Sequence, residues 1–520
     1  MFDLLIRGGT VIDGLGNRRY RADVGVRGHR IAAVGLLDES AHTEIDARGL
    51  IVAPGFIDLL GHSYAAAMRG VSAETKTRQG VTTEIVGEGW SAARHLADCF
   101  EAIETQGSEL NFGFLVGAST LRKESLHDAT SQPARAELAS MCHYLEAELA
   151  SGALGMSSAL AYVPGCHADS EEMRQLVAAA GRWGGAYFSH IRSESASLRA
   201  AIDEAIEVGR TCGVPVNIWH LKAMGQRHHG TLPAILEALR SARATGVDVA
   251  ANVYPYIASG ASLTSRLPAW ALAGGDLEMR RCLNDAGARA RLAVETAQSI
   301  AQAGGADKVM MLDATTRSPA LRAISGQFLH AIAARLDVEP AEALLRIVED
   351  STTTPYALYF SMAEVDVAAA IADPHVAFCS DAGLMLPEMT GIPTHPRVYG
   401  AFPRVLGHYV RDRQLLSLEE AIRKMTSFAA SRAQLVDRGA IAVDRIADLA
   451  IFDAAAIAGH ADFADTHRPP VGMHSVVVHG VPVLRDGSRT GARPGVAIRS
   501  AVSRAGAARA ARRESRALQR

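Results

Sequence analysis

The sequence is poor in the features that mark several large classes of protein. Only six of its 520 residues are cysteine, and they lack paired spacing, which favours a reduced, cytoplasmic protein over a disulfide framework. No apolar run reaches the roughly 18 residues that cross a bilayer, and the first residues lack the segments of a secretory signal. The formal net charge is only -3. We therefore expect neither nucleic-acid nor membrane partners.

What the chain does contain is an alternation of strands and helices between two strand-rich ends. Short strand patterns fill residues 1–53 and return over residues 431–499. From residue 54 to about 430, strand-like runs alternate with longer helical patterns, which predicts an α/β fold with a parallel barrel. Neither end alone has enough strands for a good core, so we expect both ends to join in one β-sandwich beside the barrel.

Two segments depart from this alternation. Residues from about 265 to 350 have helical patterns that no strand leads, and we expect a lid-like insertion over the barrel mouth. Residues 500–520 are rich in alanine and arginine and are predicted to form a helical or frayed tail.

Three strand-like runs of the middle region end in residues that bind metals or carry protons. His190 and His220 end two successive runs, and Asp381 ends a later one. The carboxyl ends of barrel strands meet at one face, and neutral imidazole is a good zinc ligand. A single strand-end histidine is more often a core or rim residue, and Asp381 alone could cap a helix or turn. The three together indicate a metal-dependent hydrolase.

Two further residues follow the first two strands of the predicted barrel. His62 lies just past the first strand, and Glu88 lies in the glycine-rich exit of the second. Either side chain could bind metal there. The spacing alone fits a solvated loop glutamate equally well, and His62 by itself is a weak candidate.

Two cations lie close in sequence to these candidates. Lys222 is two residues after His220, and Arg397 follows Asp381 in a loop. Cations beside a hydrolytic centre favour a substrate with an anionic group such as a carboxylate, although each could equally be an ordinary surface or structural residue.

Together these residues resemble the amidohydrolase superfamily and, within it, the D-aminoacylase (N-acyl-D-amino-acid deacylase) family. The similarity covers roughly residues 3 to 499. It starts with Leu5-Ile-Arg-Gly-Gly-Thr-Val-Ile-Asp-Gly14 and continues with Ala47-Arg-Gly-Leu-Ile-Val-Ala-Pro-Gly-Phe-Ile-Asp58, the superfamily's usual approach to the barrel. The more specific motifs are Ser189-His-Ile-Arg-Ser-Glu194, His220-Leu-Lys-Ala-Met-Gly225, Asn252-Val-Tyr-Pro-Tyr256, Ser380-Asp-Ala-Gly383 and His395-Pro-Arg-Val-Tyr-Gly400.

The resemblance implies a (β/α)8 TIM-type barrel and hydrolysis of an N-acyl amide with zinc. It implies that His190 and His220 are metal ligands and that Asp381 is the catalytic base and acid. It also implies that the substrate carboxylate is bound by Lys222, Arg397 and a tyrosine of the 254–256 motif, Tyr254 or Tyr256.

The chain departs from the family pattern at two ligand positions. Leu60 stands where the first histidine of a His-x-His pair is usual, which argues against a second metal site built on that pair. The segment after the second strand, Gly87-Glu-Gly-Trp-Ser91, has no ligand cysteine, and Glu88 is its natural replacement.

We therefore expect one zinc held by His190, His220 and Glu88, with Asp381 moving protons in the hydrolysis of a small N-acylated amino-acid-like substrate. Two alternatives remain open: an amidase for a cyclic amide or another specialised small molecule, and a non-catalytic scaffold of the same fold. The sequence leaves open the acyl group, the stereochemistry and whether the chain forms a homo-oligomer.

Overall fold

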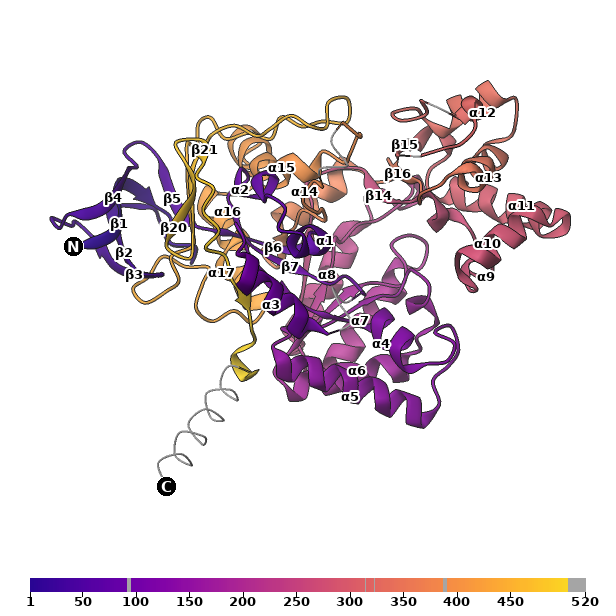
Figure 1. Cartoon of the computed structure of the whole chain (residues 1–520), viewed down its shortest axis with the longest axis horizontal. Coiled ribbons are helices and arrows are strands. Elements are labelled where there is room, and N and C mark those ends of the chain that lie inside the picture. The colour runs from indigo at the N-terminus through magenta and orange to yellow at the C-terminus, as the bar shows by residue number, and fades with distance from the viewer. Residues whose placement is uncertain (91–94, 314, 322, 387–390, 504–520) are drawn as a thin grey trace.

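The computed structural model describes residues 1–90, 95–313, 315–321, 323–386 and 391–503, and parallel strands form its centre (Figure 1). Pairing runs from β6 through β7 to β8, and from β9 through β10, β11, β12 and β13 to β17. Only Leu115 lies between β8 and β9, so these two segments together form one strand of the barrel. The ring closes where Gly61 bridges Ala382 in parallel register. Its strands are β6 (Phe56–Gly61), β7 (Val81–Val86), β8 (Asn111–Phe114), β9 (Val116–Gly117), β10 (Gly155–Ala159), β11 (Ala186–His190), β12 (Val216–Ile218), β13 (Val249–Val253) and β17 (Val376–Phe378).

Helices follow most of the barrel strands and form the outer layer of the barrel (Figure 1). Their ends carry the expected local signals: the Asp169 carboxylate caps α6 by accepting from the Glu172 N–H at 2.8 Å, and Gly213 ends α7 in the left-handed region at φ 64°. The helices of the barrel region are α1 (Tyr64–Met68), α2 (Glu74–Thr77), α3 (Leu96–Gln106), α4 (Ala118–Ser125), α5 (Arg135–Ser151), α6 (Ser170–Arg182), α7 (Leu198–Cys212), α8 (Leu232–Ala244), α14 (Glu364–Ala372), α15 (Arg397–Arg404), η7 (Val405–Asp412), α16 (Leu418–Met425) and α17 (Ser427–Arg432).

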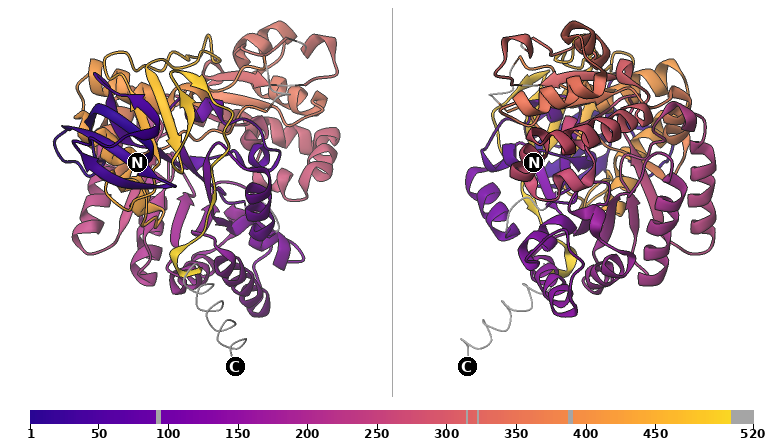
Figure 2. Two further views of the ribbon diagram at one scale, coloured as in Figure 1. Left: turned by 60° about the vertical axis from the view of Figure 1, so that its left-hand side comes forward. Right: turned by 90° about the vertical axis from the view of Figure 1, so that its right-hand side faces the viewer.

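Both ends of the chain join in one nine-stranded sheet beside the barrel, where Figure 2 shows the indigo and yellow strands next to each other. The connection is the antiparallel pairing of β5 with β18. Some apolar residues of the sheet, among them Leu4, Val24 and Leu449, form a cluster of their own, whereas others, such as Ile51 and Phe452, pack into the core of the barrel. Where the sequence predicted a β-sandwich, the strands are linked in one continuous sheet, in which β1 pairs with three strands, β2, β4 and β5. The strands are β1 (Phe2–Val11), β2 (Tyr20–Arg27), β3 (Arg30–Gly35), β4 (Ala41–Asp46), β5 (Ile51–Pro54), β18 (Leu449–Phe452), β19 (Met473–Val478), β20 (Val481–Arg485) and β21 (Ser488–Arg489).

The barrel with a β domain from both chain ends, predicted from the sequence, is thus confirmed. A short further strand, β22 (Ala497–Ile498), pairs with β8. The predicted tail lies outside the described residues from 504 onward.

An insertion between β13 and α14 has its own apolar core and extends to the right in Figure 1. Residues 265–350 are mainly helical, as expected, but they also contain one strand that the sequence analysis did not predict, β15, which pairs with β16 beside β14 in a three-stranded antiparallel sheet. The short apolar run of β15, Val-Met-Met-Leu, cannot be told from a buried helical segment by its periodicity. The elements are β14 (Ser259–Ser262), η3 (Leu263–Arg266), α9 (Ala269–Leu272), α10 (Gly275–Asn284), α11 (Ala286–Gln302), η4 (Ala306–Lys308), β15 (Val309–Asp313), η5 (Pro319–Leu321), α12 (Leu329–Leu336), α13 (Pro340–Asp350) and β16 (Tyr356–Tyr359).

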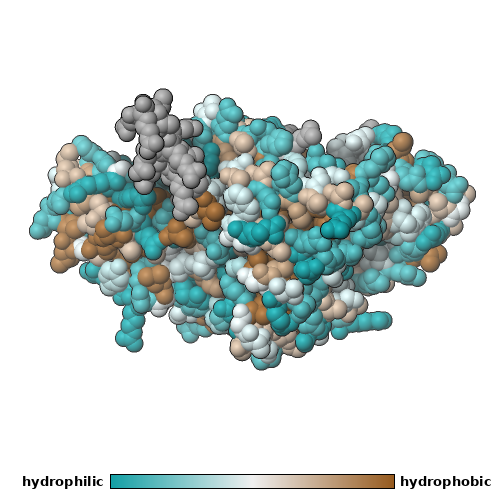
Figure 3. All heavy atoms as spheres, turned by 90° about the horizontal axis from the view of Figure 1, so that it is seen from below, coloured by the Kyte–Doolittle hydropathy of each residue, from teal (hydrophilic) through white to brown (hydrophobic). Residues whose placement is uncertain are grey.

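The surface carries apolar side chains in small patches between hydrophilic ones on the face shown in Figure 3. Within the part of the chain that the structure describes, no helix combines the length and apolar character needed to cross a membrane.

Candidate active site

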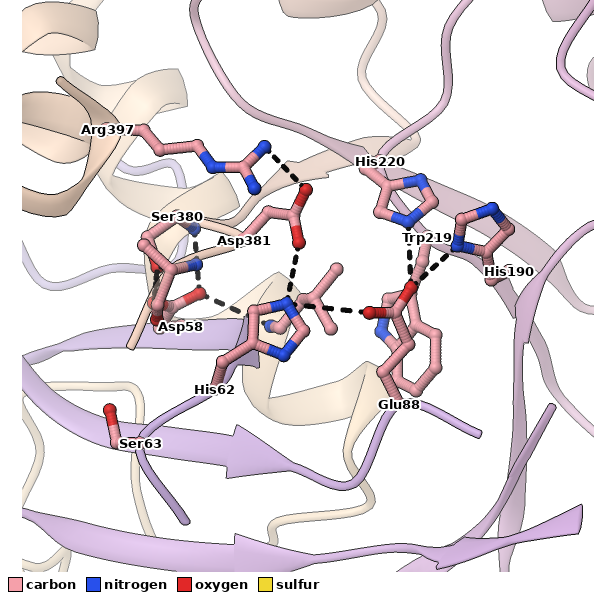
Figure 4. Close-up of polar contacts among 12 residues, drawn as sticks. Asp58, His62, Ser63, Glu88, His190, Trp219, His220, Ser380, Asp381 and Arg397 are labelled. Atoms are coloured by element: carbon pink, nitrogen blue, oxygen red, sulfur yellow. Dashed lines mark hydrogen bonds and ion pairs between the residues drawn. The ribbon is translucent and has the colours of Figure 1, made fainter. Parts of the chain in front are cut away.

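The five ligand and proton-carrier candidates meet at the carboxyl ends of the barrel strands (Figure 4). They are His62 after β6, Glu88 after β7, His190 at the end of β11, His220 after β12 and Asp381 after β17. Because all barrel strands run parallel, the residues that follow them lie at the same end of the barrel.

Glu88 is the centre of the cluster. Its Oε1 lies 2.7 Å from His190 Nδ1 and 3.0 Å from His220 Nε2. One carboxylate oxygen and two imidazole nitrogens that converge in this way match the donor set of a catalytic zinc site. The residues present therefore fit the metal that the sequence predicts.

The glycines on both sides of Glu88 explain why this loop can enter the site. Gly87 has φ 114° and Gly89 has φ 64°, in the region that favours glycine. A Cβ at Gly87 would lie 2.6 Å from the Leu115 carbonyl oxygen, and one at Gly89 would lie 2.4 Å from Ala159 Cβ. The Gly-Glu-Gly sequence thus allows the close backbone approach that brings the carboxylate to the histidines.

His62 and Asp381 form a second group that shares Glu88. His62 Nε2 lies 2.8 Å from Asp381 Oδ1 and 3.5 Å from Glu88 Oε2. These three side chains meet the spacing of a metal site as well. Leu60 contributes nothing to it, because its side chain is fully buried in the apolar cluster inside the barrel.

Two of the site residues have strained backbones. His220 has φ 35° and Asp381 has φ 50°, values that residues other than glycine adopt rarely. Such strain persists only where the surroundings enforce it, and it is concentrated at functional sites.

The charges in the cluster shift the pKa values of its members. Burial opposes ionisation of Glu88, but hydrogen bonds and charge interactions with His190 and His220 hold its pKa well below the usual range. Burial has the same effect on Asp381, and the Arg397 guanidinium at 2.6 Å and His62 more than offset it, so its pKa is lowered. Both carboxylates are therefore ionised at neutral pH and can act as ligands or proton acceptors.

Glu194, which the sequence analysis did not single out, lies behind the histidines. It is 3.0 Å from His220 Nδ1 and forms an ion pair with the Lys222 ammonium. A carboxylate on the far nitrogen of a metal-binding histidine fixes the orientation of the ring. Its position four residues after His190, in the Ser-His-Ile-Arg-Ser-Glu motif, is the sequence signal that could have found it.

For a metal bound at this cluster, the arrangement predicts a dependence of the affinity on pH. Burial and Lys222 lower the pKa of His220, but Glu194 and Glu88 outweigh them and raise it to about 9. Zinc must displace this proton, so the affinity of the metal-free protein is expected to rise about tenfold per pH unit from pH 7 to 9 and then to level off. Chelator competition measures it. An affinity that is flat over this interval contradicts the arrangement, and Glu194→Gln is expected to move the plateau to lower pH.

The residues expected to bind a carboxylate are only partly gathered. The Arg397 guanidinium lies 4.7 Å from the centre of the Tyr254 ring, and Lys222 Nζ lies 5.8 Å from it. Arg397 Nε and the Tyr254 hydroxyl are buried without a hydrogen-bond partner among the described residues. The Tyr256 hydroxyl instead donates to the Pro396 carbonyl at 3.3 Å.

An open cavity of about 1450 Å³ leads to the cluster. Loops of the barrel and the insertion line it together, and the insertion contributes Arg266, Tyr356 and Tyr359. Sequence reasoning missed these three residues because the fold, not a motif, brings the insertion to the barrel mouth.

Known proteins share these features over almost the whole chain. The model of the amidohydrolase family matches residues 43–484. A D-aminoacylase of Alcaligenes xylosoxydans xylosoxydans is 34% identical, covering 95% of this chain and 97% of the relative. An N-acyl-D-glutamate deacylase of the same organism is also 34% identical, over 97% of this chain and 98% of the relative.

A solved structure agrees with the sequence matches. The N-acyl-D-glutamate deacylase of Bordetella bronchiseptica, in complex with zinc and a phosphonate that mimics the tetrahedral intermediate, superposes with a TM-score of 0.82. It is 31% identical, covering 96% of this chain and 100% of the solved one. The chain therefore belongs to the amidohydrolase family, among the D-aminoacylases, and is a hydrolase of amide bonds.

Proposed function

We propose that this protein is a zinc-dependent deacylase that releases the free amino acid from an N-acyl-D-amino acid. The observation that carries the proposal is the convergence of Glu88, His190 and His220 on one point, beside an ionised Asp381. The names of the relatives support both the substrate class and the D configuration.

Glu88, His190 and His220 would hold the zinc, and His62 and Asp381 lie where a second ion could bind. A zinc ion supplies a Lewis acid that activates water and polarises the amide carbonyl. The donor set consists of carboxylate oxygens and imidazole nitrogens, and among the described residues no cysteine belongs to it.

Asp381 is the proton carrier in this proposal. Its Oδ2 faces Arg397 at 2.6 Å and its Oδ1 faces His62 at 2.8 Å, so the carboxylate is held at the cluster. Being ionised, it can take a proton from the attacking water and deliver it to the departing amine nitrogen.

Arg397 and Tyr254 bind the substrate carboxylate in this proposal. Both present a buried polar atom without a hydrogen-bond partner among the described residues, the Nε of Arg397 and the hydroxyl of Tyr254. A buried donor without a partner is costly, and a substrate carboxylate would satisfy both. Lys222, on the same tyrosine ring, adds positive charge, although Glu194 neutralises part of it.

Arg266 favours a substrate with an acidic side chain. It lines the same cavity, and no carboxylate of the described residues forms an ion pair with it. Its guanidinium lies 4.8 Å from the centre of the Tyr359 ring and donates to the neighbouring Ser265 hydroxyl at 3.3 and 3.4 Å. An arginine in this state can recognise a second carboxylate.

The Arg266→Met variant tests this part of the proposal. It is expected to raise KM for N-acetyl-D-glutamate about ten- to hundredfold, the worth of one charge-assisted hydrogen bond, and to leave KM for N-acetyl-D-leucine within about twofold. Steady-state kinetics with both substrates measure it. Equal effects on the two substrates would show that Arg266 does not read the side chain.

The function itself is tested by a substrate panel with the zinc-loaded protein. N-Acetyl-D-amino acids are expected to be hydrolysed faster than their L forms and faster than hydantoins. Hydrolysis of hydantoins alone would favour the cyclic-amide alternative, and no turnover at stoichiometric zinc would favour the scaffold.

A further inference from the structure

Lys76, on the short helix α2, is a fully buried cation below the active site. Its ammonium group donates to Asp58 Oδ2 at 2.6 Å, to Ser380 Oγ at 2.7 Å and to the Ala382 carbonyl at 2.9 Å. An ammonium group has three protons, and these three acceptors use all of them. Lys76 therefore joins β6, at Asp58, to the segment that follows β17.

Two of the three acceptors belong to the residues on either side of Asp381. Ser380 also donates from its backbone N–H to Asp58 Oδ1 at 2.9 Å, which ties the same segment a second time. The peptide between these contacts contains the strained backbone of Asp381, at φ 50°. A left-handed aspartate costs free energy, and contacts on both sides are what keep it in place.

The same network reaches His62. The backbone N–H of His62 donates to the Ala382 carbonyl at 3.1 Å, the oxygen that Lys76 also contacts. Glu84, 3.3 Å from Lys76 Nζ, accepts from the N–H of Ser63 at 3.0 Å. Thus one ammonium group is connected to both residues of the His62–Asp381 pair through their immediate neighbours.

We propose that Lys76 is a positioning residue that holds the Asp381 carboxylate toward His62 and the metal cluster. This inference rests on the proposed role of Asp381 as proton carrier. Lys76 does not line the cavity and does not touch substrate. Its effect is exerted through Ser380 and Ala382, and it is a lysine because three acceptors from two segments converge on one donor.

The network also carries an excess of acidic groups. Two carboxylates, Asp58 and Glu84, surround one ammonium group at 0% side-chain exposure. Burial raises the pKa of Glu84 despite the neighbouring lysine. A lysine that served only to fill space could be replaced by methionine at little cost, whereas this one compensates buried charge.

The test compares Lys76→Met with Lys424→Met in the zinc-loaded full-length enzyme. Lys424, on helix α16, is a control matched in burial: it is also fully buried, and its ammonium group donates to the Asp373 carbonyl at 2.8 Å, before β17 and away from the cavity. Lys76→Met is expected to lower kcat about ten- to hundredfold, as for a misplaced catalytic group, with KM and zinc content within about twofold of wild type. Lys424→Met is expected to leave kcat within about twofold.

Ser380→Ala provides a second variant if Lys76→Met does not fold. It removes one acceptor of Lys76 and keeps all the charges, so kcat is expected to fall about five- to tenfold at unchanged KM, the size of one hydrogen bond. An unchanged kcat in this variant, or equal losses for Lys76→Met and Lys424→Met, would overturn the proposal.

Crystal structures of the same variants give a readout that does not depend on activity. In Lys76→Met, or in Ser380→Ala in its place, Asp381 Oδ1 is expected to move beyond hydrogen-bond distance of His62 Nε2, now 2.8 Å. An unchanged distance and an unchanged backbone at Asp381 would contradict the positioning role. Inactivity of the wild type toward every N-acyl amino acid would refute the proposed function, and this crystallographic comparison would still decide the role of Lys76.

Discussion

Asp381→Asn is expected to lower kcat about 10²–10⁴-fold, the usual contribution of a positioned general base, while zinc stays bound. Asparagine keeps the size of the side chain and can still face His62 and Arg397, which are 2.8 and 2.6 Å from Asp381. It cannot take a proton from water. Steady-state kinetics and zinc analysis of the purified variant measure the two outcomes separately.

The control for this variant is Asp373→Asn. Asp373 is also buried and precedes β17, the strand that Asp381 follows. Its carboxylate pairs with Arg240 at 2.7 Å, away from the cavity. Its replacement is expected to affect stability and to leave kcat within about twofold of wild type. Normal turnover in Asp381→Asn would remove its role, whatever the control shows.

Glu88→Ala is expected to weaken zinc binding by at least about 10²-fold and to abolish turnover at stoichiometric zinc. The reason is geometric: Glu88 Oε1 is the common neighbour of His190 Nδ1 and His220 Nε2, at 2.7 and 3.0 Å. Without it, two buried imidazoles remain as ligands. Calorimetric titration of the metal-free variant measures the affinity.

Glu88→Cys separates loss of a ligand from loss of structure. A thiolate is also a zinc ligand, so this variant is expected to recover most of the affinity and to gain preference for the softer cadmium ion. If Glu88→Ala bound zinc as tightly as wild type, Glu88 would not be a ligand, and the metal would have to lie elsewhere.

The strand-end residues could be predicted from the sequence because the barrel makes their meeting unavoidable. His190 and His220 are separated by one β/α unit, and Asp381 follows a later barrel strand, β17. Parallel strands place all residues at their carboxyl ends on the same face of the barrel, whatever the length of the segments between the strands. The alternation of strands and helices in the sequence was therefore enough to predict that these three residues, far apart in the chain, lie close together.

Glu88 needed more than a pattern. A glutamate in a glycine-rich loop is ambiguous, and only the geometry shows that Gly87 and Gly89 let the chain approach Leu115 and Ala159 closely. Likewise, the two tyrosines of the 254–256 motif are alike in sequence. Only the structure distinguishes them: the Tyr254 hydroxyl has no hydrogen-bond partner among the described residues, whereas the Tyr256 hydroxyl donates to the Pro396 carbonyl.

Arg266 and Lys76 were beyond sequence reasoning for physical reasons. Arg266 reaches the cavity because a whole insertion packs at the barrel mouth, which no local motif encodes. Lys76 is charged and lies in a helix of only four residues, where a surface position is the ordinary expectation. Its burial depends on acceptors about 300 residues away in the chain, Ser380 and Ala382.

The most direct test of the account is an anomalous difference map at the zinc edge from crystals of the zinc-loaded wild-type protein. The account predicts a strong peak in contact with Glu88 Oε1, His190 Nδ1 and His220 Nε2, the three atoms that converge in Figure 4. A map with no peak among these atoms, or with the ion bound at another place in the molecule, would contradict it.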